Sequence, residues 1–190
     1  AEARTRLERY FANASTLAPD LVSAVVSIVA YAGGEEEYRL MYERFVAAST
    51  PQDKVRFLYA LAAPQVPELL RRTMDLCLSN EVKTQDAPYV IAAVLGSRTG
   101  APLAWQFIEE NWDVIGDRFP DNSIPRMLEA ISALTDAELA RRIRAFLAEH
   151  PVPQEKPVAQ ALEKLDNNVA FAARVAADLP AALRTSGPTD

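Results

Sequence analysis

Apolar side chains recur along almost the whole chain with the spacing of an α-helix. Valines at positions 22, 25, 26 and 29, for example, follow the i, i+3, i+4, i+7 pattern of one buried helix face. The two-residue alternation of a half-buried strand is nowhere sustained. We therefore predict an all-α fold without a sheet. Comparable stripes begin at Leu7, Tyr38, Val55, Leu69, Val90, Trp105, Met127, Leu139 and Leu162.

Residues that start and stop helices separate these stripes. Thr135 and Glu138 have the spacing of a capping box, in which a hydroxyl accepts from the third helical N–H and a glutamate reaches back. Thr50 and Asp53 resemble a second box, and Gly33-Gly34 is expected to end a helix. A first helical turn tolerates proline because its N–H has no partner there, and we expect such turns at Pro19, Pro51 and Pro67.

The expected helices are about 12–16 residues long and are joined by short loops, which favour antiparallel neighbours. Each helical hairpin then spans about 30–35 residues, within the range of helical-repeat proteins. No strict repeat signature is present. The expected architecture is an α-solenoid of degenerate HEAT- or armadillo-like hairpins. It forms a single domain over residues 1–183, followed by a polar, disordered tail at 184–190.

The composition excludes several classes of protein. Hydrophobic residues make up 49% of the 190 residues, enough for a globular core, yet no apolar run approaches the roughly 18–20 residues of a membrane span. The 26 acidic residues outnumber the 20 Lys and Arg residues, which argues against binding to nucleic acid. A single cysteine, Cys77, excludes internal disulfides and suits the reducing cytoplasm. We therefore expect a cytoplasmic protein with no membrane and no nucleic-acid partner.

The chain has few groups for covalent chemistry. A zinc site of the H-E-x-x-H type needs two histidines, and the sequence contains only His150, at an expected helix end where it would interact with the last carbonyls. Neither a G-x-G-x-x-G nor a G-x-x-x-x-G-K-[ST] phosphate loop occurs. Cys77 lies in an apolar stripe and is expected in the core. We therefore expect no catalytic residue, no metal ligand and no cofactor in this chain.

Four segments resemble one known family. Residues 83–86 read K-T-Q-D before an expected helix, and residues 103–112, expected on one helix, read L-A-W-Q-F-I-E-E-N-W. Residues 134–139 read L-T-D-A-E-L, and residues 161–171 read A-L-E-K-L-D-N-N-V-A-F. Together they resemble the C-terminal helical domain of aminopeptidase N-type zinc metallopeptidases, the group that includes the antigen-trimming aminopeptidases of the endoplasmic reticulum. The resemblance covers Ser79–Ala172 well and extends more loosely back to about Ala18.

The resemblance implies a function that the residues alone do not. In that family the domain is an α-solenoid that caps the catalytic domain and closes a peptide chamber over the zinc. The zinc ligands and a G-x-M-E-N loop belong to the catalytic domain, and neither motif is present here. The implied function is a non-catalytic domain that controls peptide access. Its partners are its own catalytic domain and the peptide substrate, and zinc is the cofactor of that catalytic domain. A start at Ala1 rather than methionine suits a piece of a larger protein or a processed product.

The resemblance also singles out candidate residues of the substrate chamber. A phenylalanine of the family approaches the chamber where this chain has Leu134, beside Thr135, so that an aliphatic side chain replaces a ring. Packing between helices is the alternative role for Leu134. Gln85 and Asp86 are the other candidates, and their alternative role is to cap a helix start and to form hydrogen bonds between helices.

Trp105 and Trp112 are expected to anchor the core, with Asn111 as a partner for an indole N–H.

Two other functions stay open beside the peptidase domain. One is a free-standing helical-repeat scaffold that binds a partner protein in its groove. The other, more remote, is an enzyme in its own right that uses His150 or Cys77.

Overall fold

A computed structural model describes the backbone of residues 1–185 and the side chains of residues 1–179. Within this part of the chain every regular element is a helix, which confirms the all-α prediction. Short 3₁₀ helices are η1 (Ala14–Thr16) and η2 (Glu129–Ala133). The α-helices are α1 (Glu2–Ala12), α2 (Pro19–Tyr31), α3 (Glu35–Ala47), α4 (Pro51–Ala60), α5 (Pro67–Cys77), α6 (Ala87–Leu95), α7 (Ala101–Glu110), α8 (Trp112–Arg118), α9 (Ser123–Leu128), α10 (Ala137–Glu149) and α11 (Glu155–Thr185).

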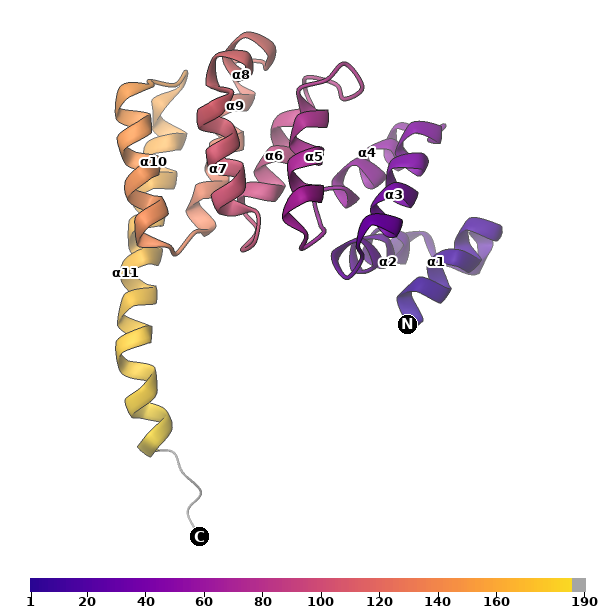
Figure 1. Cartoon of the computed structure of the whole chain (residues 1–190), viewed down its shortest axis with the longest axis horizontal. Helices are drawn as coiled ribbons and strands as arrows, with labels where there is room; N and C mark the ends of the chain where they lie inside the picture. Colours follow the sequence, from indigo (N-terminus) through magenta and orange to yellow (C-terminus); the bar gives the residue numbers. More distant parts are fainter. Residues whose placement is uncertain (186–190) are drawn as a thin grey trace.

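The helices form a row in chain order, from α1 at one end to α10 and α11 at the other (Figure 1). Consecutive helices pack as pairs: α1 with α2, α3 with α4, α6 with α7, and α10 with α11. Contacts also run along the row: α2 contacts α4, α4 contacts α6 and α6 contacts α9, while α5 contacts α7 and α7 contacts α10. Because helices pack mainly on near neighbours in the sequence, the core is drawn out along the row.

Sequence signals set several helix boundaries. Proline occupies the first turn of α2, α4 and α5, as predicted for Pro19, Pro51 and Pro67. Thr50 Oγ1 accepts a hydrogen bond from the Asp53 backbone N–H at 3.1 Å, which confirms the predicted cap of α4. These boundaries depend on local chemistry alone, so the sequence was sufficient to predict them.

The turn between α2 and α3 is formed by Gly33 and Gly34, as predicted. A Cβ atom added to Gly33 would lie 2.5 Å from the Glu37 Cβ, so no larger residue fits there without movement. The Gly34 N–H donates to Glu37 Oε2 at 2.9 Å, which ties the first turn of α3 to the glycine pair. Close backbone approach therefore explains why this turn contains glycine.

The predicted start of α10 is wrong by one residue. The N-cap is Asp136, whose Oδ1 accepts from the Leu139 N–H at 2.7 Å, and the predicted box of Thr135 and Glu138 does not form. Glu138 instead forms an ion pair with Arg141 on the same helix. Aspartate caps helices at least as well as threonine, and it stands next to the first helical residue here.

The segment predicted to form one helix over residues 103–112 is divided between α7 and α8. The break is at Asn111, whose backbone has φ −122° and ψ 20°. Its side-chain Nδ2 donates to the Phe107 carbonyl at 2.8 Å. A side chain that bonds to a nearby carbonyl competes with the regular helix ladder, which explains the division.

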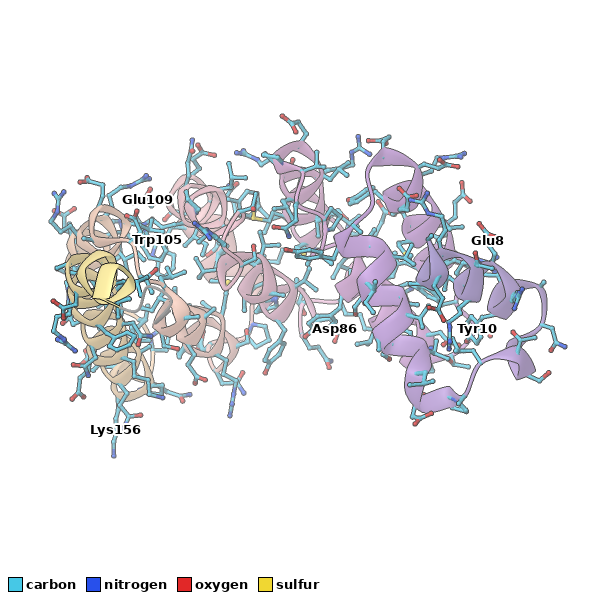
Figure 2. The ribbon with its side chains drawn as sticks, turned by 90° about the horizontal axis from the view of Figure 1, so that it is seen from below. Glu8, Tyr10, Asp86, Trp105, Glu109 and Lys156 are labelled. Carbon is cyan, nitrogen blue, oxygen red and sulfur yellow. The ribbon has the colours of Figure 1, made fainter. Side chains whose placement is uncertain are left out.

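An aromatic cluster joins α7, α8 and α10. Trp105 is fully buried, as predicted for a core anchor, whereas Trp112 is only partly buried. The Trp105 indole N–H donates to Glu109 Oε1 at 2.8 Å, and Figure 2 shows the two residues together. For Trp105 the predicted partner, Asn111, is therefore wrong. The Phe146 ring meets both indoles edge-on, with centroid separations of 5.7 and 5.4 Å.

The last helix, α11, is 31 residues long, and its first half packs against η2, α9 and α10. Val158, Ala161 and Leu165 are buried in this contact. Asn168 Nδ2 donates to the Ser132 carbonyl at 2.7 Å and ties α11 to the last turn of η2. Further along, α11 projects well past the row of helices (Figure 1).

The helix continues to Thr185, so it includes the first two residues of the predicted tail at 184–190. Residues 186–190 lie outside the described part of the chain. The single domain over residues 1–183 stays a prediction.

Candidate functional site

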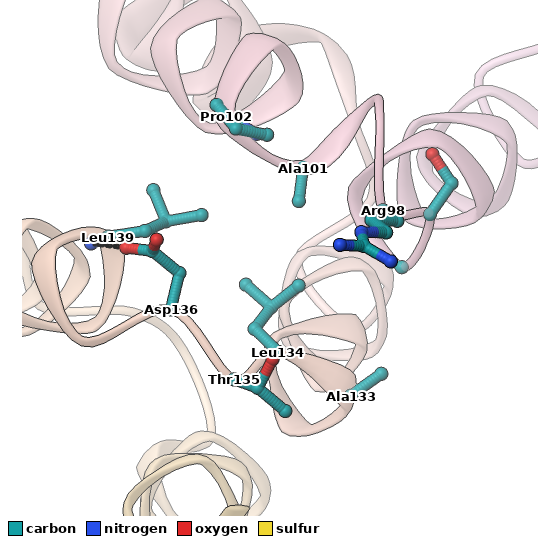
Figure 3. A pocket seen from close by; sticks show the side chains of 10 residues that line it. Arg98, Ala101, Pro102, Ala133, Leu134, Thr135, Asp136 and Leu139 are labelled. Atoms are coloured by element: carbon teal, nitrogen blue, oxygen red, sulfur yellow. Dashed lines mark hydrogen bonds between the residues drawn. The ribbon is translucent and has the colours of Figure 1, made fainter. Parts of the chain in front are cut away.

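Three segments of the chain enclose a pocket of about 650 Å³, which Figure 3 shows from close by. Its walls come from the loop after α6, the first turn of α7, the segment 133–136 that runs from the end of η2 to α10, and Leu139 in the first turn of α10. These segments are distant in the sequence but meet because α6 packs on α7, α9 and η2, and α7 packs on α10. The volume is within the range of ligand pockets in proteins.

Leu134 and Thr135, which the sequence singled out, both line this pocket (Figure 3). Leu134 is 6% exposed and forms part of the apolar floor, so it belongs to the core and to the pocket at once. Thr135 is exposed at the pocket wall. Contact of either residue with a substrate stays a prediction.

Gln85 and Asp86, the other two candidates, do not line the pocket. They precede α6, whereas the pocket begins at Gly96 after its end, and the nine-residue helix between them is about 14 Å long. Gln85 is exposed. Asp86 occupies the N-cap of α6, but its side chain makes no capping hydrogen bond, so the predicted capping role is wrong. The structure thus brings together two of the four candidates.

Two charged residues that the sequence analysis missed also line the pocket. Arg98 and Asp136 lie on opposite sides, with Ala101 and Leu134 between them (Figure 3). Arg98 is exposed, and Asp136 Oδ1 is engaged by the Leu139 N–H. In the sequence, Arg98 stands between Gly96 and Gly100, a spacing that predicts only a turn between helices. No local signal shows that this turn meets the segment before α10.

Cys77 and His150, the two side chains considered for catalysis, both have surroundings that indicate a structural role. Cys77 is fully buried, and burial raises the pKa of its thiol to about 12, so that it stays protonated. His150 Nδ1 lies 2.9 Å from the Phe146 carbonyl, in the last turn of α10, as predicted for a helix end. The imidazole also stacks on the Phe146 ring with centroids 3.9 Å apart.

The described side chains do not fit a zinc ion, because no three of their His, Cys, Asp or Glu groups gather at one place. We therefore derive no step through a metal held by this chain. None of the described helices combines the length and the apolar character needed to span a bilayer.

Comparison with known proteins agrees with the resemblance seen in the sequence. Residues 1–167 match the family described as the ERAP1-like C-terminal domain. The chain is 30% identical to human glutamyl aminopeptidase over 142 residues, which cover 72% of this chain and 15% of that protein. It is 27% identical to Arabidopsis thaliana aminopeptidase M1 over 175 residues, which cover 88% of this chain and 20% of that protein.

Rat endoplasmic reticulum aminopeptidase 1 is 30% identical over 121 residues, which cover 60% of this chain and 13% of that protein. The chain thus spans no more than a fifth of the length of these relatives. The family match covers most of the chain, and the relatives that we name are all aminopeptidases. The chain therefore belongs to the ERAP1-like C-terminal domain family, as a C-terminal domain of aminopeptidase N-type peptidases.

Proposed function

We propose that this chain is the non-catalytic C-terminal domain of a zinc-dependent aminopeptidase, and that it caps the catalytic domain and completes the peptide chamber. The observation that carries the proposal is the family match over residues 1–167. In this proposal the longer protein removes N-terminal residues from peptides. The zinc and its ligands belong to the catalytic domain, and the C-terminal domain controls access to the chamber.

The pocket supports a role in peptide handling. Its floor is apolar at Leu134 and Leu139, and its walls carry one charge of each sign, at Arg98 and Asp136. Such a surface suits a peptide segment, which presents apolar and polar groups in alternation. Leu134 and Thr135 are the proposed chamber-lining residues, because they lie in this pocket. Gln85 and Asp86 lie outside it and are not proposed for contact.

The type of helical repeat and the location in the cell stay predictions. The HEAT- or armadillo-like solenoid is supported by the contacts between helices that are near neighbours in the sequence. A cytoplasmic location is supported only by the single thiol, Cys77, which suits a reducing compartment.

The alternative functions have less support. The aminopeptidase relatives favour a peptidase domain over a free-standing scaffold. The environments of Cys77 and His150 favour structural roles over catalysis by this chain alone. Reading the coding region upstream of Ala1 separates the first two functions. An in-frame H-E-x-x-H motif supports the peptidase domain, and a start codon close to Ala1 supports the scaffold.

The proposed chamber role is tested in the full-length polypeptide with Thr135→Arg. A long charged side chain at this exposed pocket position would obstruct a peptide but not a small amino-acid anilide. We expect kcat/KM for a ten-residue peptide to fall at least about tenfold, and kcat/KM for leucine p-nitroanilide to change less than about twofold.

Ala137→Arg is the matched control, because Ala137 is exposed two residues away and does not line the pocket. It adds the same side chain, and we expect neither kinetic constant to change. The proposal is contradicted if Thr135→Arg hydrolyses the long peptide as efficiently as the unaltered enzyme.

A further inference from the structure

The second half of α11 carries apolar side chains that the rest of the described chain does not cover. Phe171, Val175 and Leu179 have 59%, 38% and 48% of their surface exposed. They stand four residues apart on the part of α11 that projects past the row of helices (Figure 1). Large apolar side chains clustered on an exposed helix indicate a contact surface.

One side of this projecting half continues the face that docks the first half of α11, whereas Phe171 lies about 120° away from that face and is not part of it. Leu165, which is fully buried, marks the direction of the docked face. At 100° per residue, Ala172, Ala176 and Leu179 lie within about 40° of that direction. Arg174 lies on the opposite side of the helix. The projecting half is therefore amphipathic in the same orientation as the half that packs on η2 and α9.

The apolar face begins one helical turn beyond the point where α11 is tied to η2, the helix that leads into the pocket segment. Asn168 is hydrogen-bonded to the carbonyl of Ser132, which lies two residues before Leu134 of the pocket floor. Ala172 is one helical turn further along α11. A large protein surface that packs over the pocket segment can therefore also contact the projecting helix.

We propose that Ala172, Val175, Ala176 and Leu179, here called the α11 strip, form the surface on which the catalytic domain of the same polypeptide packs. This inference rests on the proposed function. The occupant is an apolar surface of the catalytic domain, because the strip itself is apolar. The charged side chain of Arg174 lies on the opposite side of the helix.

Two observations favour this occupant over a second copy of the chain. The relatives contain the matched region as only 13% to 20% of much longer proteins, so each copy of the domain has a large neighbour on its own chain. The strip also begins one helical turn beyond Asn168, whose hydrogen bond to Ser132 ties α11 to the segment that leads into the pocket of the proposed function.

Adjacent alanines provide a matched test. The double variant A172D/A176D places two charges on the α11 strip. The double variant A173D/A177D places the same two charges about 100° away around the helix. Ala172 is partly exposed and the other three alanines are exposed. In the 190-residue chain alone, both variants should therefore unfold within a few degrees of each other.

The measurement is amide hydrogen exchange of residues 169–179 in the full-length polypeptide and in the 190-residue chain. We expect exchange in the full-length polypeptide to be at least about tenfold slower than in the 190-residue chain, because a covered helix opens less often. A172D/A176D should abolish this slowing, since it buries charges without partners, whereas A173D/A177D should retain it.

Equal exchange in the two double variants overturns the α11 strip as the docking surface, and so does equal exchange in the two lengths of chain. A dimer of the 190-residue chain that only A172D/A176D disrupts also overturns it, because a second copy then covers the strip. These results leave the proposed function intact. The proposed function fails separately, if the full-length polypeptide has no catalytic domain.

Discussion

At the scale of single residues, Thr73 shows how a polar group is accommodated in this core. Its side chain is fully buried in α5. Thr73 Oγ1 lies 2.7 Å from the Leu61 carbonyl, and 3.1 Å from the hydroxyl of Tyr38, which also lies in the core. The single Thr73 hydroxyl proton can be donated to the carbonyl while the oxygen accepts from Tyr38. This arrangement joins α3, α5 and the C-cap residue of α4 through one atom.

Thr73→Val keeps the shape of the side chain but removes this hydroxyl. We expect the free energy of unfolding to fall by about 1–3 kcal/mol, because the Leu61 carbonyl and the Tyr38 hydroxyl lose a buried partner. Urea unfolding followed by circular dichroism measures the change. Thr73→Ser is the control: it keeps the hydroxyl and should cost only about 0.8 kcal/mol for the lost methyl group. A valine variant as stable as the unaltered chain would contradict this reading.

At the scale of elements, the start of α3 depends on Glu37. Its carboxylate accepts from the Gly34 N–H at 2.9 Å and forms an ion pair with Arg4 of α1. The hydrogen bond from Gly34, aided by Arg4, holds the pKa of Glu37 below its ordinary value of 4.5. The folded state thus favours the ionised carboxylate. Its stabilising effect is present at pH values above 4.5 and is lost as the pH falls through the lowered folded-state pKa.

Glu37→Gln retains an oxygen acceptor but removes the charge. We expect the free energy of unfolding to fall by about 1 kcal/mol at pH 7. We expect the difference in unfolding free energy between the variant and the unaltered chain to become smaller below pH 4.5. Denaturant unfolding between pH 3 and pH 7 measures both effects. Glu36→Gln is the control, since Glu36 is exposed in the same turn and should show a smaller difference. A difference that is constant over this range would show that the charge does not contribute.

The starts of the helices differ in how well the sequence predicts them. Pro19, Pro51 and Pro67 could be placed in first helical turns because the cause is the residue itself. The start of α10 could not be placed correctly, because Thr135 and Asp136 are both good caps and the sequence does not say which one is used. Competition between adjacent residues of similar chemistry is decided by the chain geometry on either side.

At the scale of the whole molecule, the all-α fold followed from the periodicity of the apolar residues, whereas the pocket did not. Leu134 and Thr135 were found through a family resemblance. Arg98 and Asp136 were missed, because they come together only when the loop after α6 meets the segment before α10. The projecting half of α11 is a similar case. Its sequence predicts an ordinary amphipathic helix. Only the structure shows that the row of helices ends before the apolar face of α11 does.

In the proposed function, this domain contributes surface and not chemistry to an aminopeptidase. The most direct measurement is the release of p-nitroaniline from leucine p-nitroanilide, with equimolar zinc, by the 190-residue chain and by the full-length polypeptide. We predict turnover by the full-length polypeptide and a rate from the 190-residue chain equal to that of zinc in buffer. Zinc-dependent turnover by the 190-residue chain, lost on His150→Ala, would contradict the account.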